Sequence, residues 1–356
     1  MASLTETSII ARKIIRFGIY GLTFLIFLRT SFSVGKNIYR KLFPEPPPKP
    51  TVTFGKLPNL SFPEGTRKTD GLSFTLETAQ GALPVFSDQQ KIYLMPKSSP
   101  AIGQPETAKF KAQQMGFNPK ELELVETVFQ FQHPKAPATL VMNIVTQVWS
   151  ISFDLRVSPY VLDDLPPDPD RALAIARSFL SQGDFLKEDL EGRTTHEYLK
   201  VAEGKFVTAL SRSDANLIKV NLFRKDYETI PPVTLNPKEG NVWFLMGGSR
   251  APENQIIAAE YHYYPIEEKR AGTYPIKTSQ AAWDELTKGE GFVADMGENK
   301  DEKIVIRNVY LGYFDPGQYS EFYQPVYVFE GDNNFTSYVP AVTAQFYGRD
   351  ETQISP

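Results

Sequence analysis

Three stretches of the chain place apolar residues with the period of an α-helix. They run over residues 105–116, 169–183 and 278–289. Proline opens the first two, where its missing N–H needs no partner, and a threonine can cap the third. Each stretch ends at a glycine, which suits the left-handed residue that commonly closes a helix. The pattern therefore predicts three short helices, and alanines four residues apart give the first two a small-residue face.

Most of the remaining chain predicts β-strands. Ile304 and Ile306, and again Val326 and Val328, lie two residues apart in such runs, which is the period of a half-buried strand. The aromatic content of 13% also favours sheet, and residues 332–334 (Asp-Asn-Asn) predict a turn. The expected strands are residues 121–132, 139–155, 197–202, 205–210, 217–223, 242–246, 256–265, 303–314, 324–330 and 335–342.

These elements predict an α+β fold in which short helices lie on antiparallel sheets. We expect three helix-on-sheet units in succession, over residues 72–160, 166–265 and 272–347, followed by a tail of residues 348–356. Their likeness has two interpretations. One is duplication of a single unit, and the other is the general similarity of short amphipathic helices in α+β proteins.

The N-terminal region carries an uncharged apolar run over residues 17–28. Twelve helical residues reach about 18 Å, less than the ~30 Å hydrocarbon core of a bilayer. Extension over residues 14–34 gives enough length, and Arg16 and Arg29 then lie near the ends, where long side chains reach the headgroups. We therefore expect a transmembrane helix over residues 14–34, after a short cytoplasmic tail of residues 1–13.

Two other interpretations of this region stay open. Residues 31–33 (Ser-Phe-Ser) have the small-residue spacing of a signal-peptide cleavage site, although Arg29 lies where such sites are usually uncharged. A helix lying in the membrane interface is the other alternative. Basic residues flank the run on both sides, so charge alone does not fix the orientation. We expect the N-terminus in the cytoplasm because a short N-terminal tail and a following stalk are typical of such anchors.

Residues 35–71 predict a basic juxtamembrane segment and a stalk. Five prolines within residues 44–50 (PEPPPKP) favour an extended polyproline II spacer. Residues 1–50 hold eight basic and two acidic side chains, which suits contact with anionic lipid headgroups. The rest of the chain holds 30 basic and 40 acidic side chains. An acidic body argues against nucleic acid as a partner, because phosphate binding needs a basic surface.

The sequence offers few groups for catalysis. It has no cysteine, which excludes disulfides and zinc–thiolate sites, and His133, His196 and His262 lack metal-ligand spacing. No nucleophile elbow, phosphate loop or dinucleotide motif occurs. Acidic residues at 163–164 and 168–170 precede a helix, where carboxylates suit the N-terminus. We expect no catalytic residue, no metal and no cofactor; two acids far apart in the chain are the open route to glycosidase chemistry.

An aromatic cluster near the C-terminus is the best candidate for partner binding. Tyrosine suits interfaces because it combines apolar area with a polar tip. The alternative is that these aromatics form sheet core and that only the loop of residues 315–323 is exposed. The candidate partner-binding residues are Tyr313, Tyr319, Phe322, Tyr323 and Gln324.

The third unit has a distinctive residue pattern. A helix starting A-W-x-x-L-x-x-G precedes a strand ending L-x-Y, then a strand P-V-Y-x-F and a closing hairpin. The residues that carry the pattern are Ala282, Trp283, Leu286, Gly289, Leu311, Tyr313, Pro325, Val326, Tyr327, Phe329 and Tyr338. The pattern resembles the C-terminal part of bacterial membrane-anchored regulators of the YycH/YycI type and related PepSY-like extracytoplasmic modules. The resemblance implies a membrane-tethered protein that regulates or inhibits a partner, such as a sensor kinase or an envelope hydrolase.

These observations together predict a single-pass membrane-anchored extracytoplasmic protein of the bacterial cell envelope that binds or regulates and does not catalyse. Its expected partners are the membrane and another envelope protein, and not nucleic acid. Two alternatives stay open. The chain can be a structural subunit of an envelope secretion or adhesion assembly, or an envelope hydrolase acting on glycan or peptide.

The third unit also allows a packing prediction. Ala282, Trp283 and Leu286 fall on one helical stripe, which can lie against the sheet. In residues 326–329 the valines and the aromatics point to opposite faces of the strand. We expect the helix to pack on the valine face and the aromatic residues to line the other side.

Overall fold

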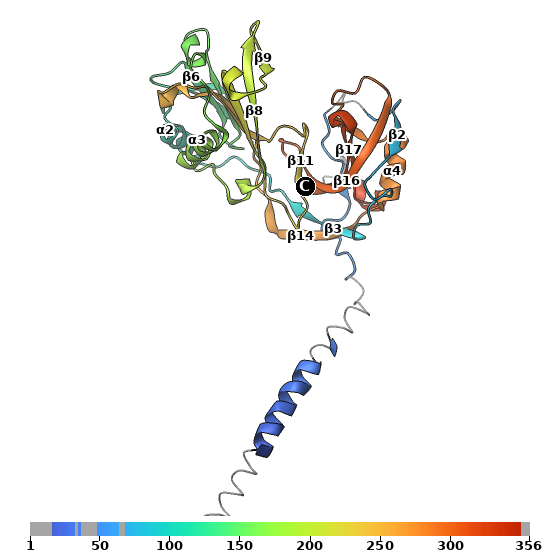
Figure 1. Cartoon of the computed structure of the whole chain (residues 1–356). Helices are drawn as coiled ribbons and strands as arrows, with labels where there is room; N and C mark the ends of the chain where they lie inside the picture. The colour runs from blue at the N-terminus through green and yellow to red at the C-terminus, as the bar shows by residue number, and fades with distance from the viewer. Residues whose placement is uncertain (1–15, 33–34, 37–47, 64–67, 350–356) are drawn as a thin grey trace, which may run out of the picture. The chain divides into compact units, whose positions relative to one another are not determined.

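The computed structural model describes residues 16–32, 35–36, 48–63 and 68–349. Two compact units make up the chain, residues 1–49 and residues 50–356. Figure 1 shows a helix in the first unit, and sheets with a few short helices in the second. The α+β class predicted from the sequence is confirmed.

The first unit contains a helix over residues 16–32. Its large apolar side chains are exposed, among them Phe17 (71%) and Phe27 (68%). None of the helices in the described part of the chain is both long enough and apolar enough to cross a membrane. The span expected over residues 14–34 extends past this helix at both ends, beyond the described residues. Residues 1–13, residues 37–47 and 64–67 of the juxtamembrane segment and stalk, and most of the expected C-terminal tail also lie outside them.

The first sheet of the second unit has nine strands, and all neighbours pair antiparallel. Its strands come from both of the segments 72–160 and 166–265, so these two segments share one sheet. In spatial order the strands are β4 (Glu121–Val125), β5 (Val128–Gln132), β6 (Ala138–Asn143), β7 (Trp149–Phe153), β13 (Ile256–Tyr261), β12 (Val242–Met246), β10 (Leu217–Leu222), β8 (Thr194–Ala202) and β9 (Lys205–Thr208).

Two of the runs expected as single strands are hairpins. Residues 121–132 fold back between β4 and β5, and residues 139–155 contain β6 and β7. In the second case Oδ1 of Asn143 accepts the backbone N–H groups of Val145 and Thr146, both at 3.0 Å. This side-chain turn is one that asparagine favours, and it ends β6 before the apolar pattern does.

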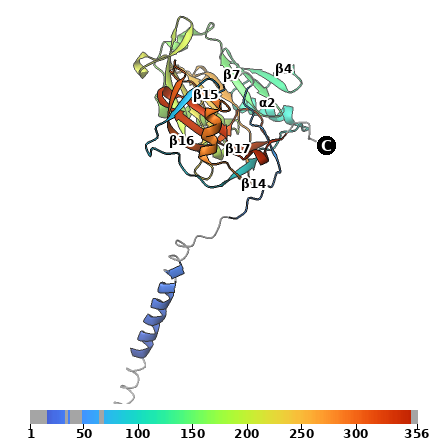
Figure 2. The same ribbon diagram turned by 90° about the vertical axis from the view of Figure 1, so that its right-hand side faces the viewer.

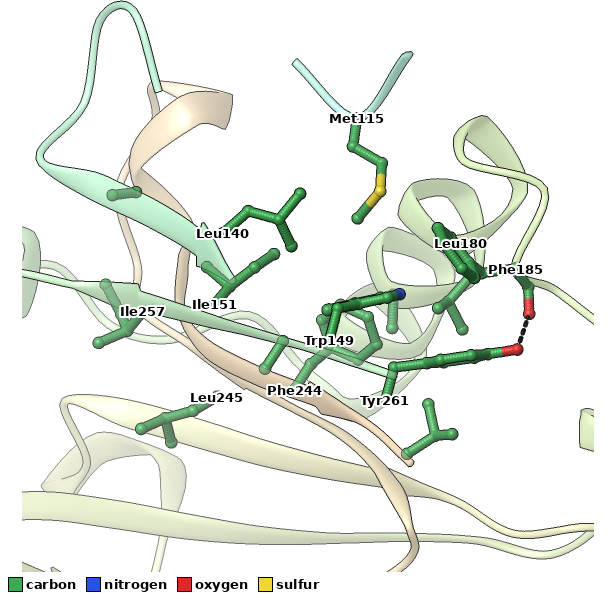
Figure 3. Packing of buried hydrophobic residues seen from close by; sticks show 14 of the residues in the cluster. Met115, Leu140, Trp149, Ile151, Leu180, Phe185, Phe244, Leu245, Ile257 and Tyr261 are labelled. Atoms are coloured by element: carbon green, nitrogen blue, oxygen red, sulfur yellow. Dashed lines mark hydrogen bonds between the residues drawn. The ribbon is translucent and has the colours of Figure 1, made fainter. Parts of the chain in front are cut away.

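Helices α2 (Gln104–Gln114) and α3 (Pro169–Gln182) lie on one face of this sheet (Figure 1). The buried face of α3 consists of Ala172, Ala176 and Leu180, and the two small alanines let the helix approach the sheet closely. Figure 3 shows the core between them, where the ring of Trp149 is stacked on that of Tyr261 at 5.4 Å. The first core therefore lies between the two helices and one sheet face.

The second sheet is mixed. β2 and β11 run parallel to β16, and the other pairs are antiparallel. Its strands are β11 (Pro232–Thr234), β16 (Lys303–Asp315), β17 (Phe322–Gly331), β18 (Thr336–Pro340), β15 (Phe292–Asp295), β2 (Ser73–Leu76), β3 (Gln89–Leu94) and β14 (Glu267–Pro275). β1 (Leu57–Pro58) and β19 (Tyr347–Arg349) form a separate parallel pair.

Short 3-10 helices connect several strands. They are η1 (Pro159–Leu162), η2 (Glu188–Glu191), η3 (Arg212–Asp214), η4 (Pro252–Asn254), η5 (Asp332–Asn334) and η6 (Ala344–Phe346). η5 is the predicted Asp-Asn-Asn turn, and Asn333 and Asn334 adopt positive φ angles of 55° and 64° there. Asparagine tolerates this left-handed conformation better than most residues, which explains the sequence at this turn.

Helix α4 (Ser279–Thr287) packs on the second sheet, as Figure 2 shows with the orange helix in front of the strands. It packs on the aromatic face, so the prediction of the valine face is wrong. Ala282 and Leu286 share a buried cluster with Tyr327 and Phe329. Trp283 is half-buried, and its ring centroid lies 6.0 Å from that of Phe329.

The valine face of β17 is covered by a different part of the chain. Val326 and Val328 cluster with Leu60 of the N-terminal segment, and Phe62 packs against the same cluster. Phe62 stacks on Phe292 of β15 at 4.3 Å. Because this segment already fills the valine face, the helix is left with the aromatic one.

The glycines that end the three helices have two different roles. Gly116 (φ 92°) and Gly289 (φ 88°) adopt the predicted left-handed conformation. Gly183 does not, and the following Asp184 has the positive φ of 56° instead. A Cβ on Gly183 would lie 2.8 Å from Sδ of Met115. A side chain at this position would therefore force the Met115 side chain to move.

Candidate functional site

The predicted partner-binding residues lie around the end of β16 and the start of β17, and most of them are buried. Tyr313, Phe322, Tyr323 and Gln324 are at most 3% exposed, whereas Tyr319 in the connecting loop is 36% exposed. A buried side chain cannot contact a partner in this conformation. Of this set, only Tyr319 is available at the surface.

Tyr313 and Tyr323 instead form part of the second core. Their rings stack with a centroid distance of 4.9 Å, and the Tyr313 hydroxyl donates to the backbone oxygen of Lys91 at 2.8 Å. Burial raises the pKa of both phenols far above the usual value, so both stay neutral. This arrangement corresponds to the alternative in which the aromatic cluster is sheet core.

A buried ion-pair cluster next to these tyrosines joins the two sheets. Arg224 follows β10 of the first sheet, Asp315 ends β16 of the second, and Asp189 lies in η2. Nε of Arg224 donates to Oδ2 of Asp315 at 2.7 Å, and Nη1 donates to Oδ2 of Asp189 at 2.6 Å. Nη2 donates to the backbone oxygen of Tyr264, and the guanidinium lies 4.3 Å from the ring centroid of Tyr263.

Arg224 keeps its charge although its side chain is only 2% exposed. Burial alone lowers the pKa of Arg224, but the charges of Asp315 and Asp189 outweigh burial and raise that pKa well above its usual value. Asp189 and Asp315 are far apart in sequence, as the two catalytic acids of a glycosidase can be. Because each carboxylate holds the guanidinium, the cluster connects the two sheets and does not present an open acid pair.

The first sheet carries a groove of about 680 Å³ beside α3, which we call the α3 groove. Its floor includes Ala138, Ile151 and Ile256 from three neighbouring strands, and its α3 wall includes Ile175 and Phe179. Pockets for small ligands typically measure about 300–1,000 Å³ and are mostly apolar with a few polar groups. The α3 groove has the size and lining of such a pocket.

Two faces of α3 have different surroundings, and one of them forms a wall of this groove. The alanine face packs on the sheet, whereas the adjoining stripe Arg171, Ala174 and Ser178 faces the groove. Residues 115–117 after α2 and residues 133–135 between β5 and β6 supply other parts of the wall. Figure 3 shows Met115 above the sheet face that carries Leu140 and Ile151.

His133 provides a hydrogen-bond donor in this groove. Its Nδ1 accepts the backbone N–H groups of Lys135 at 3.2 Å and Ala136 at 3.0 Å. Burial lowers the pKa of His133, so the ring is neutral near pH 7. A neutral ring that accepts at Nδ1 carries its proton on Nε2. That atom lies 3.6 Å from where a Cβ on Gly116 would be, and both residues line the groove.

Two cations and one acid complete the polar part of the lining. Lys135 and Arg171 are exposed, and neither forms an ion pair with an acid among the described residues. Glu253 of η4 lies on the same groove, and its charge acts on His133. The α3 groove therefore offers more donors and positive charge than acceptors, above an apolar floor.

The other polar residues singled out in the sequence have structural roles. Asp168 caps α3, since its Oδ1 accepts the N–H of Arg171 at 2.9 Å. His262 contacts Glu260 at 3.4 Å and the backbone oxygen of Gly317 at 3.1 Å. Within residues 16–32, 35–36, 48–63 and 68–349, no group of three or more His, Asp or Glu side chains is placed to hold a metal ion.

Sequence reasoning missed both the ion-pair cluster and the α3 groove. Arg224 is one of many arginines in the chain, and its partners are 35 and 91 residues away. Lys135 lies two residues after His133 in the sequence, but Arg171 and Glu253 lie far from both. No periodicity marks these residues, so only the tertiary structure brings them together.

The comparisons with known proteins identify no family. No protein-family model matches the chain, and no curated protein matches it. Among solved structures, an uncharacterized protein from Eubacterium rectale is similar at 14% sequence identity and a TM-score of 0.35. The match covers 74% of this chain and 86% of that one. A similarity of this size carries no argument about function, and the resemblance to YycH/YycI-type regulators stays a prediction.

Proposed function

We propose that the chain is a membrane-tethered, extracytoplasmic binding protein of the bacterial cell envelope that regulates a partner and does not catalyse. The observation that carries the binding role is the α3 groove, a preformed apolar pocket with hydrogen-bond donors in its lining. The anchor over residues 14–34 and the stalk belong to the same proposal, as does duplication of a helix-on-sheet unit, of which the first two copies would share the nine-stranded sheet.

The tether is supported by the exposed apolar surface of residues 16–32. Phe24, Leu25 and Leu28 are 62%, 64% and 53% exposed. Exposed apolar area of this extent marks contact with a membrane or a partner. The seventeen helical residues reach about 26 Å, and the ~30 Å of a hydrocarbon core needs about 20 residues, fewer than the 21 of the proposed span over residues 14–34.

The binding role can be tested by native mass spectrometry of the full-length protein released gently from its own membranes. We expect a non-covalent ligand to accompany the wild-type chain. Ser178→Trp fills the α3 groove from an exposed α3 position and should abolish the ligand. Ser181→Trp is the matched control, because Ser181 is exposed on the same helix and does not line the groove. Loss of ligand in both variants, or in neither, would contradict the binding role.

The tether can be tested by carbonate washing of membranes. The wild type should stay in the pellet, and Leu25→Arg should be released, because an arginine at a helix centre costs about 2.5–3.5 kcal/mol in a bilayer. The control is Leu210→Arg, since Leu210 is a 98% exposed leucine of the second unit. Release of the wild type, or a mature chain that begins at Val34, would show that residues 14–34 are not a permanent anchor.

One observation favours the structural-subunit alternative. Both edge strands of the nine-stranded sheet expose apolar side chains, with Leu122 (59%) on β4, Phe206 (50%) on β9 and Leu210 (98%) just after β9. Exposed apolar edge strands are sites where a further strand can add. Stoichiometric co-purification of other membrane proteins, lost in Phe206→Lys, would support an assembly role over regulation.

A further inference from the structure

We propose that the α3 groove binds a small apolar monocarboxylate of the fatty-acid type, with its chain on the sheet floor and its carboxylate at His133, Lys135 and Arg171. This inference rests on the proposed binding function and names its ligand class. It is a statement about the second unit alone, so it does not depend on the membrane anchor.

The floor of the α3 groove determines the apolar part of the ligand. Ile151 on the sheet and Ile175 and Phe179 on α3 offer aliphatic and aromatic surface from both sides. Contact with such surfaces is favourable in proportion to the apolar area removed from water. The volume of about 680 Å³ accommodates a medium-length chain.

The charges in the lining determine the polar part. Nδ1 of His133 accepts two backbone N–H groups, so Nε2–H is a hydrogen-bond donor that no described residue uses. Lys135 and Arg171 add two positive charges that no described acid neutralises within an ion pair. A carboxylate accepts bonds from all three donor types, and charge-assisted hydrogen bonds are about twice as strong as neutral ones.

Glu253 makes the groove selective among charged ligands. One acid against two cations leaves the lining net positive, so a monoanion is favoured over a zwitterion or a cation. The single carboxylate of Glu253 also disfavours a ligand with several negative charges, because like charges repel. A monocarboxylate therefore fits the lining better than a phosphate-bearing or amine-bearing amphiphile.

The test is photocrosslinking of the full-length protein in lipid nanodiscs. One probe is a medium-chain fatty acid that carries a diazirine in its chain, and the other is the matching alcohol. Adducts are mapped by peptide mass spectrometry. We expect the acid to label groove peptides at least about tenfold more than the alcohol, as one to two charge-assisted bonds imply. Octanoate should compete with the acid.

Variants separate the head group from the apolar floor. Lys135→Ala/Arg171→Ala should reduce labelling by the acid at least about tenfold and leave labelling by the alcohol unchanged. Lys269→Ala is the matched control, since Lys269 is an exposed lysine of β14 without an ion pair to a described acid. Ser178→Trp should abolish labelling by both probes.

Three outcomes would overturn the inference. They are equal labelling by acid and alcohol, labelling that survives Ser178→Trp, and displacement by an apolar peptide with a free C-terminus at lower concentration than by octanoate. The last outcome would assign the groove to peptides. If native mass spectrometry finds a ligand without a carboxylate, the binding role stands and this inference fails. If no ligand is found and the acid probe still labels the groove, the carboxylate site stands, and the expectation that the protein carries a bound ligand in its own membranes fails.

Discussion

Nε of Arg224 donates a hydrogen bond of 2.7 Å to Oδ2 of Asp315, and this contact joins the first sheet to the second. Arg224 follows β10, and Asp315 is the last residue of β16. Both side chains are at most 5% exposed. Because Asp189 holds the same guanidinium, removal of the arginine would leave two buried carboxylates without a cation.

Arg224→Ala should therefore lower the free energy of unfolding by about 3–5 kcal/mol, the usual cost of breaking a buried ion pair from one side. Urea unfolding of the full-length chain, followed by far-ultraviolet circular dichroism, measures this change. Arg307→Ala is the control, because Arg307 pairs with Asp332 and Glu77 at the surface with 47% of its side chain exposed. Equal losses in both variants would show that burial of the Arg224 cluster contributes nothing.

Gly192 packs directly against the backbone of Arg224. A Cβ on Gly192 would lie 1.9 Å from the backbone oxygen of Arg224, a distance that forces the backbone to move. Gly192→Ala should cost about 1–3 kcal/mol, as overpacking usually does. In a double-mutant cycle, its effect should not add to that of Arg224→Ala.

The control for this cycle is Gly204→Ala. Gly204 has a positive φ of 74° and open space around its Cβ position, so its replacement costs only the strain of the left-handed conformation, about 1–2 kcal/mol. Gly204 lies just after β8, and no atom of the Arg224 cluster lies within 4 Å of its Cβ position. Its effect should therefore add to that of Arg224→Ala. Additivity at both glycines would contradict a link between Gly192 and the ion-pair cluster.

Local patterns predicted the elements well because their causes are local. Thr278 caps α4 by accepting the N–H of Ala281, and the strand expected over residues 242–246 is β12. The pairing of strands was not predictable in the same way. β2 and β3 precede α2 in the sequence and yet join the second sheet, since pairing depends on long-range contacts that no short window contains.

The candidate site shows the same limit. The sequence located an aromatic cluster but not its burial, because the alternation of residues 323–329 fits a strand with either one or both faces covered. β17 is covered on both faces, by α4 on one and by the segment around Phe62 on the other. The lining of the α3 groove comes from five separate segments, so its residues share no pattern.

The corrected packing of α4 changes the expected cost of mutations there. Phe329 is fully buried under α4, and Phe329→Ala should cost about 3–5 kcal/mol. Trp283 is only half-buried against Phe329 and Phe74, so Trp283→Ala should cost roughly half as much, about 1.5–2.5 kcal/mol. Urea unfolding measures both. A larger loss at Trp283 than at Phe329 would contradict the packing of the helix on the aromatic face.

A second contact between the sheets should depend on pH. The Glu260 carboxylate raises the pKa of His262 above 6.5, and the same contact lowers the pKa of Glu260 below 4.5. The Nδ1 atom of His262 also lies 3.1 Å from the backbone oxygen of Gly317, which follows β16, and a protonated ring donates to both partners. Lys219 acts on Glu260 from the neighbouring strand.

The signs of the two shifts define the pH window of this contact. A raised histidine pKa gives stability that is complete below about pH 6.5 and is lost as the pH rises through the folded-state pKa. A lowered glutamate pKa gives stability that is complete above about pH 4.5 and is lost as the pH falls. The contact should therefore stabilise the fold most between about pH 4.5 and pH 6.5.

His262→Gln should accordingly destabilise the full-length chain more at about pH 5.5 than at about pH 8.5 in urea unfolding. His133 titrates with the opposite sign, because burial lowers its pKa, but it is present in both proteins and its effect cancels in the difference. His196→Gln is the control for removal of an imidazole, since His196 is exposed on β8 and forms no ion pair with a described acid. A loss in His262→Gln that is equal at both pH values would show that the ring stays neutral between the two sheets.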